Sequence, residues 1–168
     1  FGSIVLKMDK KGLPLQDAKW YALRTLPRGE KMVLKRLELE GVRCMLPMAE
    51  IRRRWSDRVK MSPIPLVSSL VFVHCTPLRL KALLATKGVC GVRSDHSGEP
   101  IEVEQQSIDA IEEFSRYARG SFLASEGDID RAMEIPWERR CSQVVDVDRR
   151  YSYLYVRELD LMLCIDRN

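Results

Sequence analysis

The sequence predicts an α+β fold in which helices flank an antiparallel sheet and a small all-β part follows. Helical and strand-like patterns alternate through residues 19–119, and only strand-like patterns recur after that. The strongest strand signal lies between Pro65 and Cys75, where Leu70 to Val73 is continuously apolar. Such a run is typical of the central strand of a sheet. The same stretch could instead present an apolar patch to a partner, and the pattern alone does not choose between the two.

Residues 1–46 are predicted to form an arm, two strands and a helix. Residues 1–18 show no periodicity and are predicted to form an N-terminal arm. A strand is predicted from Lys19 to Thr25, and a helix from Arg28 to Glu40, where Gly41 supplies the stop. A second strand is expected from Val42 to Leu46.

A basic hairpin is predicted next. Two short extended stretches flank Ser56–Asp57, a pair that favours a turn, and Trp55 lies near the tip. This segment carries more positive charge than solubility needs, which indicates binding to nucleic acid or to an acidic protein surface. A simple solvated hairpin is the alternative. Its cations are Arg52, Arg53, Arg54, Arg58 and Lys60.

The elements after the central strand complete the first domain, predicted over residues 19–119. Thr76–Pro77 is a strong helix start, with Thr as the N-cap and Pro at the first helical position. A strand from Val89 to Arg93 and a loop from Ser94 to Pro100 follow. The last helix is predicted from Glu104 to Arg119, with acidic residues at its beginning, as the helix dipole favours.

The composition then shifts. Residues 120–133 begin with small and polar side chains and are predicted to form a linker, and residues 134–168 a small β domain. Its strands are expected at Val144 to Val147, Tyr151 to Val156 and Leu159 to Ile165, from alternating apolar residues.

Composition and cysteine usage narrow the class of protein. The chain has 168 residues, of which 45% are hydrophobic and 31% charged, with a net charge of +4, an ordinary globular balance. No apolar run approaches the ~18 residues that span a membrane, so no membrane contact is expected. The five cysteines are scattered without a C-x-x-C pair. This pattern predicts no metal site and fits a reducing cytoplasm better than a disulfide framework.

No catalytic constellation is recognisable. The two histidines, His74 and His96, are far apart in sequence, and no G-x-S-x-G, H-E-x-x-H or Gly-rich phosphate loop occurs. Cys90 lies in an apolar strand without a local base. We therefore predict that the protein is not an enzyme and uses neither a cofactor nor a small-molecule substrate.

A second basic cluster lies on the first predicted helix. At about 100° per residue, Arg28, Lys31 and Lys35 fall together, opposite the apolar stripe of Val33 and Leu37. A solvated helix face explains such a cluster equally well. The functional interpretation is a stripe that follows the phosphates of a polyanion.

Several short motifs occur in a fixed order between Lys19 and Arg119. They are WY in the first strand, E-K-x-V-x-x-x-L in the helix, M-L-P after it, R-R-W-S-D-R-V-K, PLVSSLVFV and KGVCGVRS. Together they resemble the N-terminal domain of NusG-family transcription elongation factors. The W-S-D-R hairpin is similar to that of the UpxY-like antiterminators of Bacteroides-type bacteria, which regulate capsular polysaccharide operons.

The resemblance implies a non-enzymatic factor that docks on the clamp helices of RNA polymerase and touches the non-template DNA strand. The polymerase-binding residues carried over are Trp20, Leu66, Val67 and Leu70. Val67, Ser68 and Leu70 stand where relatives keep Phe, Pro and Tyr, so aromatic anchors are missing. The helix cluster falls where relatives meet the non-template strand, and the hairpin would meet upstream DNA or the opposite lobe of the polymerase.

The resemblance also bears on the C-terminal part. Family members normally end in a KOW domain, so this part is predicted to be a divergent KOW/SH3-like barrel, although the usual G-P-F-x-G turn is absent. The alternative function is a stand-alone nucleic-acid-binding α+β module of the RNA-recognition type. Such a module needs aromatic side chains exposed on its central strands, and Leu70 to His74 offers only Phe72.

Overall fold

The computed structural model describes residues 17–123, 145–146 and 150–168. It contains three α-helices and antiparallel sheets among these residues, which confirms the predicted α+β class. The contacts divide the chain into two compact units, each assembled from separated segments. Unit 1 combines the described part of Phe1–Leu46 with Ser68–Glu104, and unit 2 combines Pro47–Val67 with the described part of Gln105–Asn168. The predicted domain boundaries stay a prediction, and the predicted arm and linker lie mostly outside the described residues.

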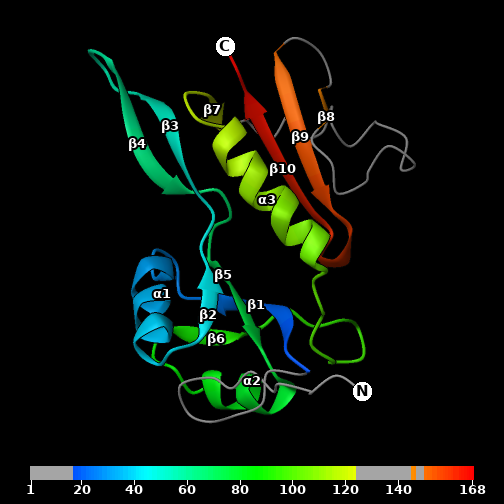
Figure 1. Cartoon of the computed structure of the whole chain (residues 1–168). Helices are drawn as coiled ribbons and strands as arrows, with labels where there is room; N and C mark the ends of the chain where they lie inside the picture. Colours follow the sequence, from blue (N-terminus) through cyan, green and yellow to red (C-terminus); the bar gives the residue numbers. More distant parts are fainter. Residues whose placement is uncertain (1–16, 124–144, 147–149) are drawn as a thin grey trace, which may run out of the picture. The chain divides into compact units, whose positions relative to one another are not determined.

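Unit 1 is built on a four-stranded antiparallel sheet in the order β2-β5-β1-β6 (Figure 1). Its two central strands are β1 (Lys19–Thr25) and β5 (Leu70–Cys75), paired from Lys19 opposite Cys75 to Arg24 opposite Leu70. The edge strands are β2 (Arg43–Met45) and β6 (Val89–Val92). The central strand predicted from the apolar run is thus confirmed, beginning at Leu70.

Helix α1 (Glu30–Leu39) packs on β2 and β5 through the fully buried Val33 and Leu37. It begins two residues later than predicted because Arg28 adopts a left-handed conformation, with φ 61°. The first turn is fixed by Glu30, which is buried and accepts a hydrogen bond from the backbone N–H of Ser69 at 2.8 Å. This bond ties the start of the helix to the residue before β5.

Helix α2 (Pro77–Leu83) starts as the sequence predicts. The Thr76 hydroxyl accepts a hydrogen bond from the Arg79 backbone N–H at 3.2 Å, as an N-cap does. The Arg79 side chain is buried and pairs with Glu40 at 3.3 Å, which links α2 to the end of α1.

Unit 2 contains the predicted hairpin, a helix and a second sheet (Figure 1). The hairpin strands are β3 (Met48–Arg54) and β4 (Val59–Pro65). Helix α3 (Gln105–Tyr117) contacts β3 and β9, and Ile108, Ile111 and Phe114 on it are buried. The four-stranded sheet has the order β7-β10-β9-β8, from strands β7 (Phe122–Leu123), β8 (Val145–Asp146), β9 (Tyr151–Val156) and β10 (Leu161–Asp166).

The C-terminal strands match the all-β prediction with one shift. β9 has the predicted bounds, but the last strand begins at Leu161 rather than Leu159. A 3₁₀ turn, η2 (Arg157–Leu159), and the left-handed Asp160 with φ 47° occupy the connection instead. The completeness of a KOW-like barrel stays a prediction. None of the described helices is long and apolar enough to cross a membrane.

Candidate nucleic-acid interface

The register of the β3–β4 hairpin sorts its side chains into two faces. Residues directly opposite each other in an antiparallel pair project to the same side. Arg52 pairs with Met61 and Arg54 with Val59, so these four share one face. Arg53 pairs with Lys60 on the other face. We call the first the Arg54 face and the second the Arg53 face.

The hairpin tip is a tight turn that holds Trp55 and Arg58 at its two ends. The Trp55 backbone N–H donates to the Arg58 carbonyl at 2.7 Å across Ser56–Asp57. The Trp55 side chain is 57% exposed. An aromatic ring this open at the end of a basic hairpin is accessible for stacking and is not a core residue.

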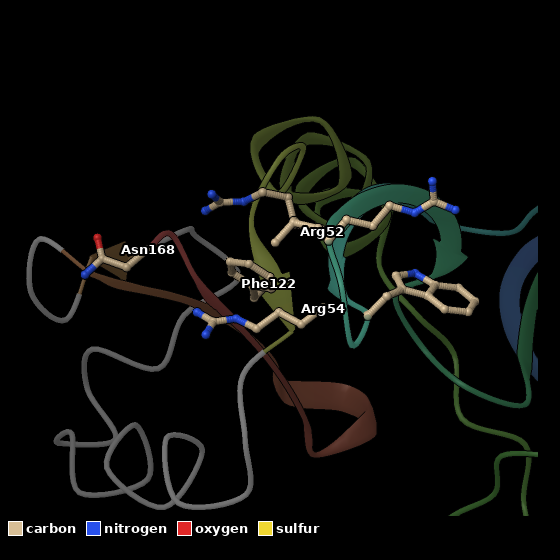
Figure 2. A pocket seen from close by; sticks show the side chains of 7 residues that line it. Arg52, Arg54, Phe122 and Asn168 are labelled. Carbon is tan, nitrogen blue, oxygen red and sulfur yellow. The ribbon is translucent and has the colours of Figure 1, made fainter.

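On the Arg54 face, two guanidinium groups lie against one aromatic ring. The guanidinium carbons of Arg52 and Arg54 lie 4.4 Å and 4.9 Å from the centroid of the Phe122 ring, and Figure 2 shows this ring between the two side chains. Both distances fall within the ~6 Å reach of a cation–π contact. Phe122 thus anchors the two arginines, and the exposed Arg54 keeps its N–H edge available to other acceptors.

Backbone hydrogen bonds bring Phe122 to this position. The Arg52 N–H donates to the Ser121 carbonyl at 2.8 Å, and the Gly120 N–H donates to the Glu50 carbonyl at 2.8 Å. The Arg52 side chain is half-buried and donates from Nη2 to the Arg167 carbonyl at 3.1 Å. Arg52, predicted as a nucleic-acid contact, is therefore already engaged within the protein.

A cavity of about 370 Å³ opens at this end of the hairpin (Figure 2). Among the described residues, no aspartate or glutamate side chain lines it, and its described charged side chains are arginines. A volume of this size accommodates a small organic ligand. The lining residues are Arg52, Arg54, Trp55, Arg58, Val59, Phe122 and Asn168.

The remaining predicted hairpin cations are exposed. Arg53, Arg54, Arg58 and Lys60 all project into solvent, and none forms an ion pair with a described residue. Arg53 and Lys60 lie directly opposite each other, a like-charge pair that destabilises a hairpin. An arrangement that costs stability in the free protein is favourable once a polyanion covers it.

The second basic cluster lies in unit 1. Lys31 and Lys35 are exposed on α1, and Arg28 is exposed in the turn before it. Because Arg28 is outside the helix, the three cations do not form the single helical stripe that the sequence suggested.

The four predicted polymerase-binding residues are mostly covered. Trp20, Val67 and Leu70 are 4–5% exposed, and Leu66 is half-buried. Trp20 and Leu70 belong to unit 1, and Leu66 and Val67 to unit 2. The docking role of these residues stays a prediction, with Leu66 offering the most surface.

Trp20 lies in a cross-strand row with His74 and Arg43. The Trp20 and His74 ring centroids are 5.1 Å apart, and the Arg43 guanidinium carbon lies 5.1 Å from the Trp20 ring. Burial lowers the pKa of His74, and the neighbouring Arg43 charge lowers it further.

The central strand gives no stacking platform. Phe72, the single aromatic side chain from Leu70 to His74, is fully buried. A module of the RNA-recognition type would need such rings in the open. The geometry therefore favours the hairpin over β5 as a nucleic-acid contact. Within the described residues, no group of histidine, cysteine and acidic side chains could hold a metal ion.

Comparison with known proteins identifies the family. Residues 18–112 match the family model described as "Transcription termination factor nusG". This chain belongs to the NusG family. That family consists of non-enzymatic transcription elongation and antitermination factors, and its members generally bind RNA polymerase.

The chain was also compared with curated proteins and with solved structures. No curated protein matches the chain. Among solved structures, one described as "Domain interaction in Thermotoga maritima NusG" is similar, with 16% sequence identity and a TM-score of 0.48. The match covers 91% of this chain and 96% of that one.

Proposed function

We propose that this NusG-family protein is an antitermination factor that binds the clamp helices of elongating RNA polymerase and contacts the non-template DNA strand. The family match supports the polymerase part, because it spans residues 18–112 and so includes all described elements of unit 1 and the β3–β4 hairpin. The basic hairpin supports the nucleic-acid part.

The observation that carries the nucleic-acid contact is the exposed charge of the hairpin. Arg53, Arg54, Arg58 and Lys60 lie within eight consecutive residues and have no acidic partner among the described residues. Unpaired cations on a rigid element bind phosphates by releasing the counterions of the polyanion. The exposed Arg28, Lys31 and Lys35 of unit 1 would add a second contact.

Docking on the polymerase is proposed at the residues carried over from the resemblance. Leu66 has the most accessible side chain of this set, and its backbone N–H donates to the Pro47 carbonyl at 2.9 Å, which fixes the base of the hairpin. Trp20, Val67 and Leu70 are 4–5% exposed and so offer a partner little side-chain surface. The similarity of the W-S-D-R hairpin to UpxY-like factors favours a role at polysaccharide operons in the cytoplasm.

The test is co-purification combined with a pausing assay. The tagged full-length chain should retain RNA polymerase subunits from a lysate of its native host and shorten pauses of that polymerase in vitro. Replacing Arg28, Lys31 and Lys35 with Glu should reduce the effect on pausing more than it reduces polymerase binding.

The matched control replaces the exposed Lys87, Arg116 and Arg157 with Glu, which changes the net charge by the same amount elsewhere. This control should leave pausing as in the unmodified protein. Absence of polymerase from the purified sample, or equal effects of the two triple variants, would overturn the proposal.

A further inference from the structure

The cavity at the hairpin tip has the chemistry of a site for one nucleotide rather than of a uniform basic surface. Its described lining joins arginine side chains, two aromatic rings, one valine and Asn168, and includes no acidic side chain. A nucleotide presents the complementary groups, namely a flat π-system and a phosphate. Both of its components therefore find a matching surface in this one cavity.

The arginines of the cavity divide into anchored and available groups. Arg52 is half-buried, and it stacks on Phe122 and donates to the Arg167 carbonyl. Arg54 stacks on the same ring but is exposed, and Arg58 is exposed at the turn. A guanidinium that stacks through its face keeps its N–H edge for bidentate bonds to an anion. Arg54 and Arg58 are thus the phosphate-binding candidates.

Trp55 supplies the second half of the site. Its ring is largely exposed and lines the cavity, and no ring or cation of a described residue stacks on it. The hydrogen bond from its backbone to Arg58 holds the ring and the Arg58 guanidinium on one small turn. Base–aromatic stacking beside a cationic groove is how single strands are bound without dependence on sequence.

We propose that this cavity binds one unstacked nucleotide of a single-stranded nucleic acid, with the base on Trp55 and the phosphate on Arg54 and Arg58. A duplex does not fit this chemistry, because its base faces are already stacked inside the helix. An acidic peptide would use the arginines but leave the Trp55 ring without a partner. The inference rests on the proposed nucleic-acid contact and adds its position and its ligand.

The experiment measures the binding of fluorescein-labelled ten-nucleotide oligomers to the full-length chain by fluorescence anisotropy at about 50 mM salt. The probes are oligothymidylate, oligouridylate and a ten-base-pair duplex, and a deca-glutamate peptide serves as a competitor. The variants are Trp55→Ala, Trp55→Phe and Arg54→Gln. Arg53→Gln is the matched control, because it removes the same charge from the same strand on the opposite face.

The single strands should bind more tightly than the duplex. Trp55→Ala should weaken their binding by about tenfold, the loss of one stacked base, and Trp55→Phe should restore most of it. Arg54→Gln should weaken binding more than Arg53→Gln. This pattern with oligothymidylate or with oligouridylate supports the site and identifies DNA or RNA as its ligand.

Three results would overturn the inference: unchanged binding in Trp55→Ala, equal losses in Arg54→Gln and Arg53→Gln, or displacement of the oligomer by deca-glutamate at an equal concentration of charge. If polymerase co-purifies and Trp55→Ala binds oligomers normally, this inference fails alone. If the unmodified chain binds no single strand, the nucleic-acid part of the proposed function fails with it.

Discussion

The central strand β5 and the β3–β4 hairpin are neighbours in sequence, yet the side chains of β5 are mostly buried and those at the hairpin tip are exposed. Val71, Phe72 and Val73 of β5 are fully buried, although successive residues face opposite sides of the sheet. Every residue from Arg53 to Met61 on the hairpin is exposed. The difference separates a strand that holds unit 1 together from an element whose tip contributes little to the core and is available for binding.

The largest effect should come from placing a charge in β5. Leu70→Asp buries a carboxylate at a position that is 4% exposed, so we expect a loss of at least about 3 kcal/mol in the free energy of unfolding. Val59→Asp, on the exposed part of the hairpin, should change it by no more than about 0.5 kcal/mol. Urea denaturation measures both. Similar losses for the two variants would break the comparison.

The hydrogen bond between Glu30 of α1 and Ser69 before β5 is expected to contribute to the stability of unit 1. Glu30→Ala leaves the Ser69 N–H without its acceptor and should cost about 1–3 kcal/mol in the free energy of unfolding. Glu38→Ala, on the exposed surface of the same helix, is the control and should be close to neutral. A neutral Glu30→Ala variant would show that the buried carboxylate is dispensable.

A smaller loss is expected where the hairpin is anchored. Phe122→Leu keeps an apolar side chain but removes the ring on which Arg52 and Arg54 stack, at a cost of about 1 kcal/mol. Leu123→Ala, at the next and exposed position, should cost less. Thermal denaturation followed by circular dichroism compares the two. If Leu123→Ala proved the more damaging, the cation–π contacts would not anchor the hairpin.

The smallest expected effect on the free energy of unfolding is its dependence on pH through His74. The pKa of His74 is lowered from 6.5 in the folded chain, chiefly by burial and then by Arg43, so the unfolded chain binds more protons between the two pKa values. The contribution of His74 to stability is therefore complete above pH 6.5 and is lost as the pH falls toward the lowered pKa.

Unfolding free energies measured from pH 7.5 to pH 5 should show this loss, and His74→Gln should reduce the slope. His96, which is exposed in a loop, provides the control substitution His96→Gln and should leave the slope unchanged. An identical slope in His74→Gln and the unmodified chain would contradict the assignment.

Much of the fold could be predicted because its signals are local. The bounds of β1 and of the strand from Tyr151 to Val156 agree with those predicted, and Thr76 caps the N-terminus of α2 as predicted. The beginning of α1 could not be predicted in the same way. It depends on the left-handed Arg28, a conformation that nothing in the neighbouring residue types requires.

The candidate site was predictable only in part. The exposed charge of the hairpin follows from residue types around a turn. The role of Phe122 does not, because the pairing of Arg52 with Ser121 joins residues far apart in sequence and β7 has only two residues. Likewise, an apolar run cannot distinguish a docking patch from a core strand, because the burial of Leu70 depends on tertiary packing that the run itself does not encode.

The account is tested most directly by crosslinking on a reconstituted elongation complex with a photoreactive non-template strand. The unmodified chain should bind the polymerase and crosslink to the single-stranded part of that strand. A variant with Arg53, Arg54, Arg58 and Lys60 replaced by Gln should still bind the polymerase but lose most of the crosslink. A crosslink of unchanged strength in this variant, or no polymerase binding by the unmodified chain, would contradict the account.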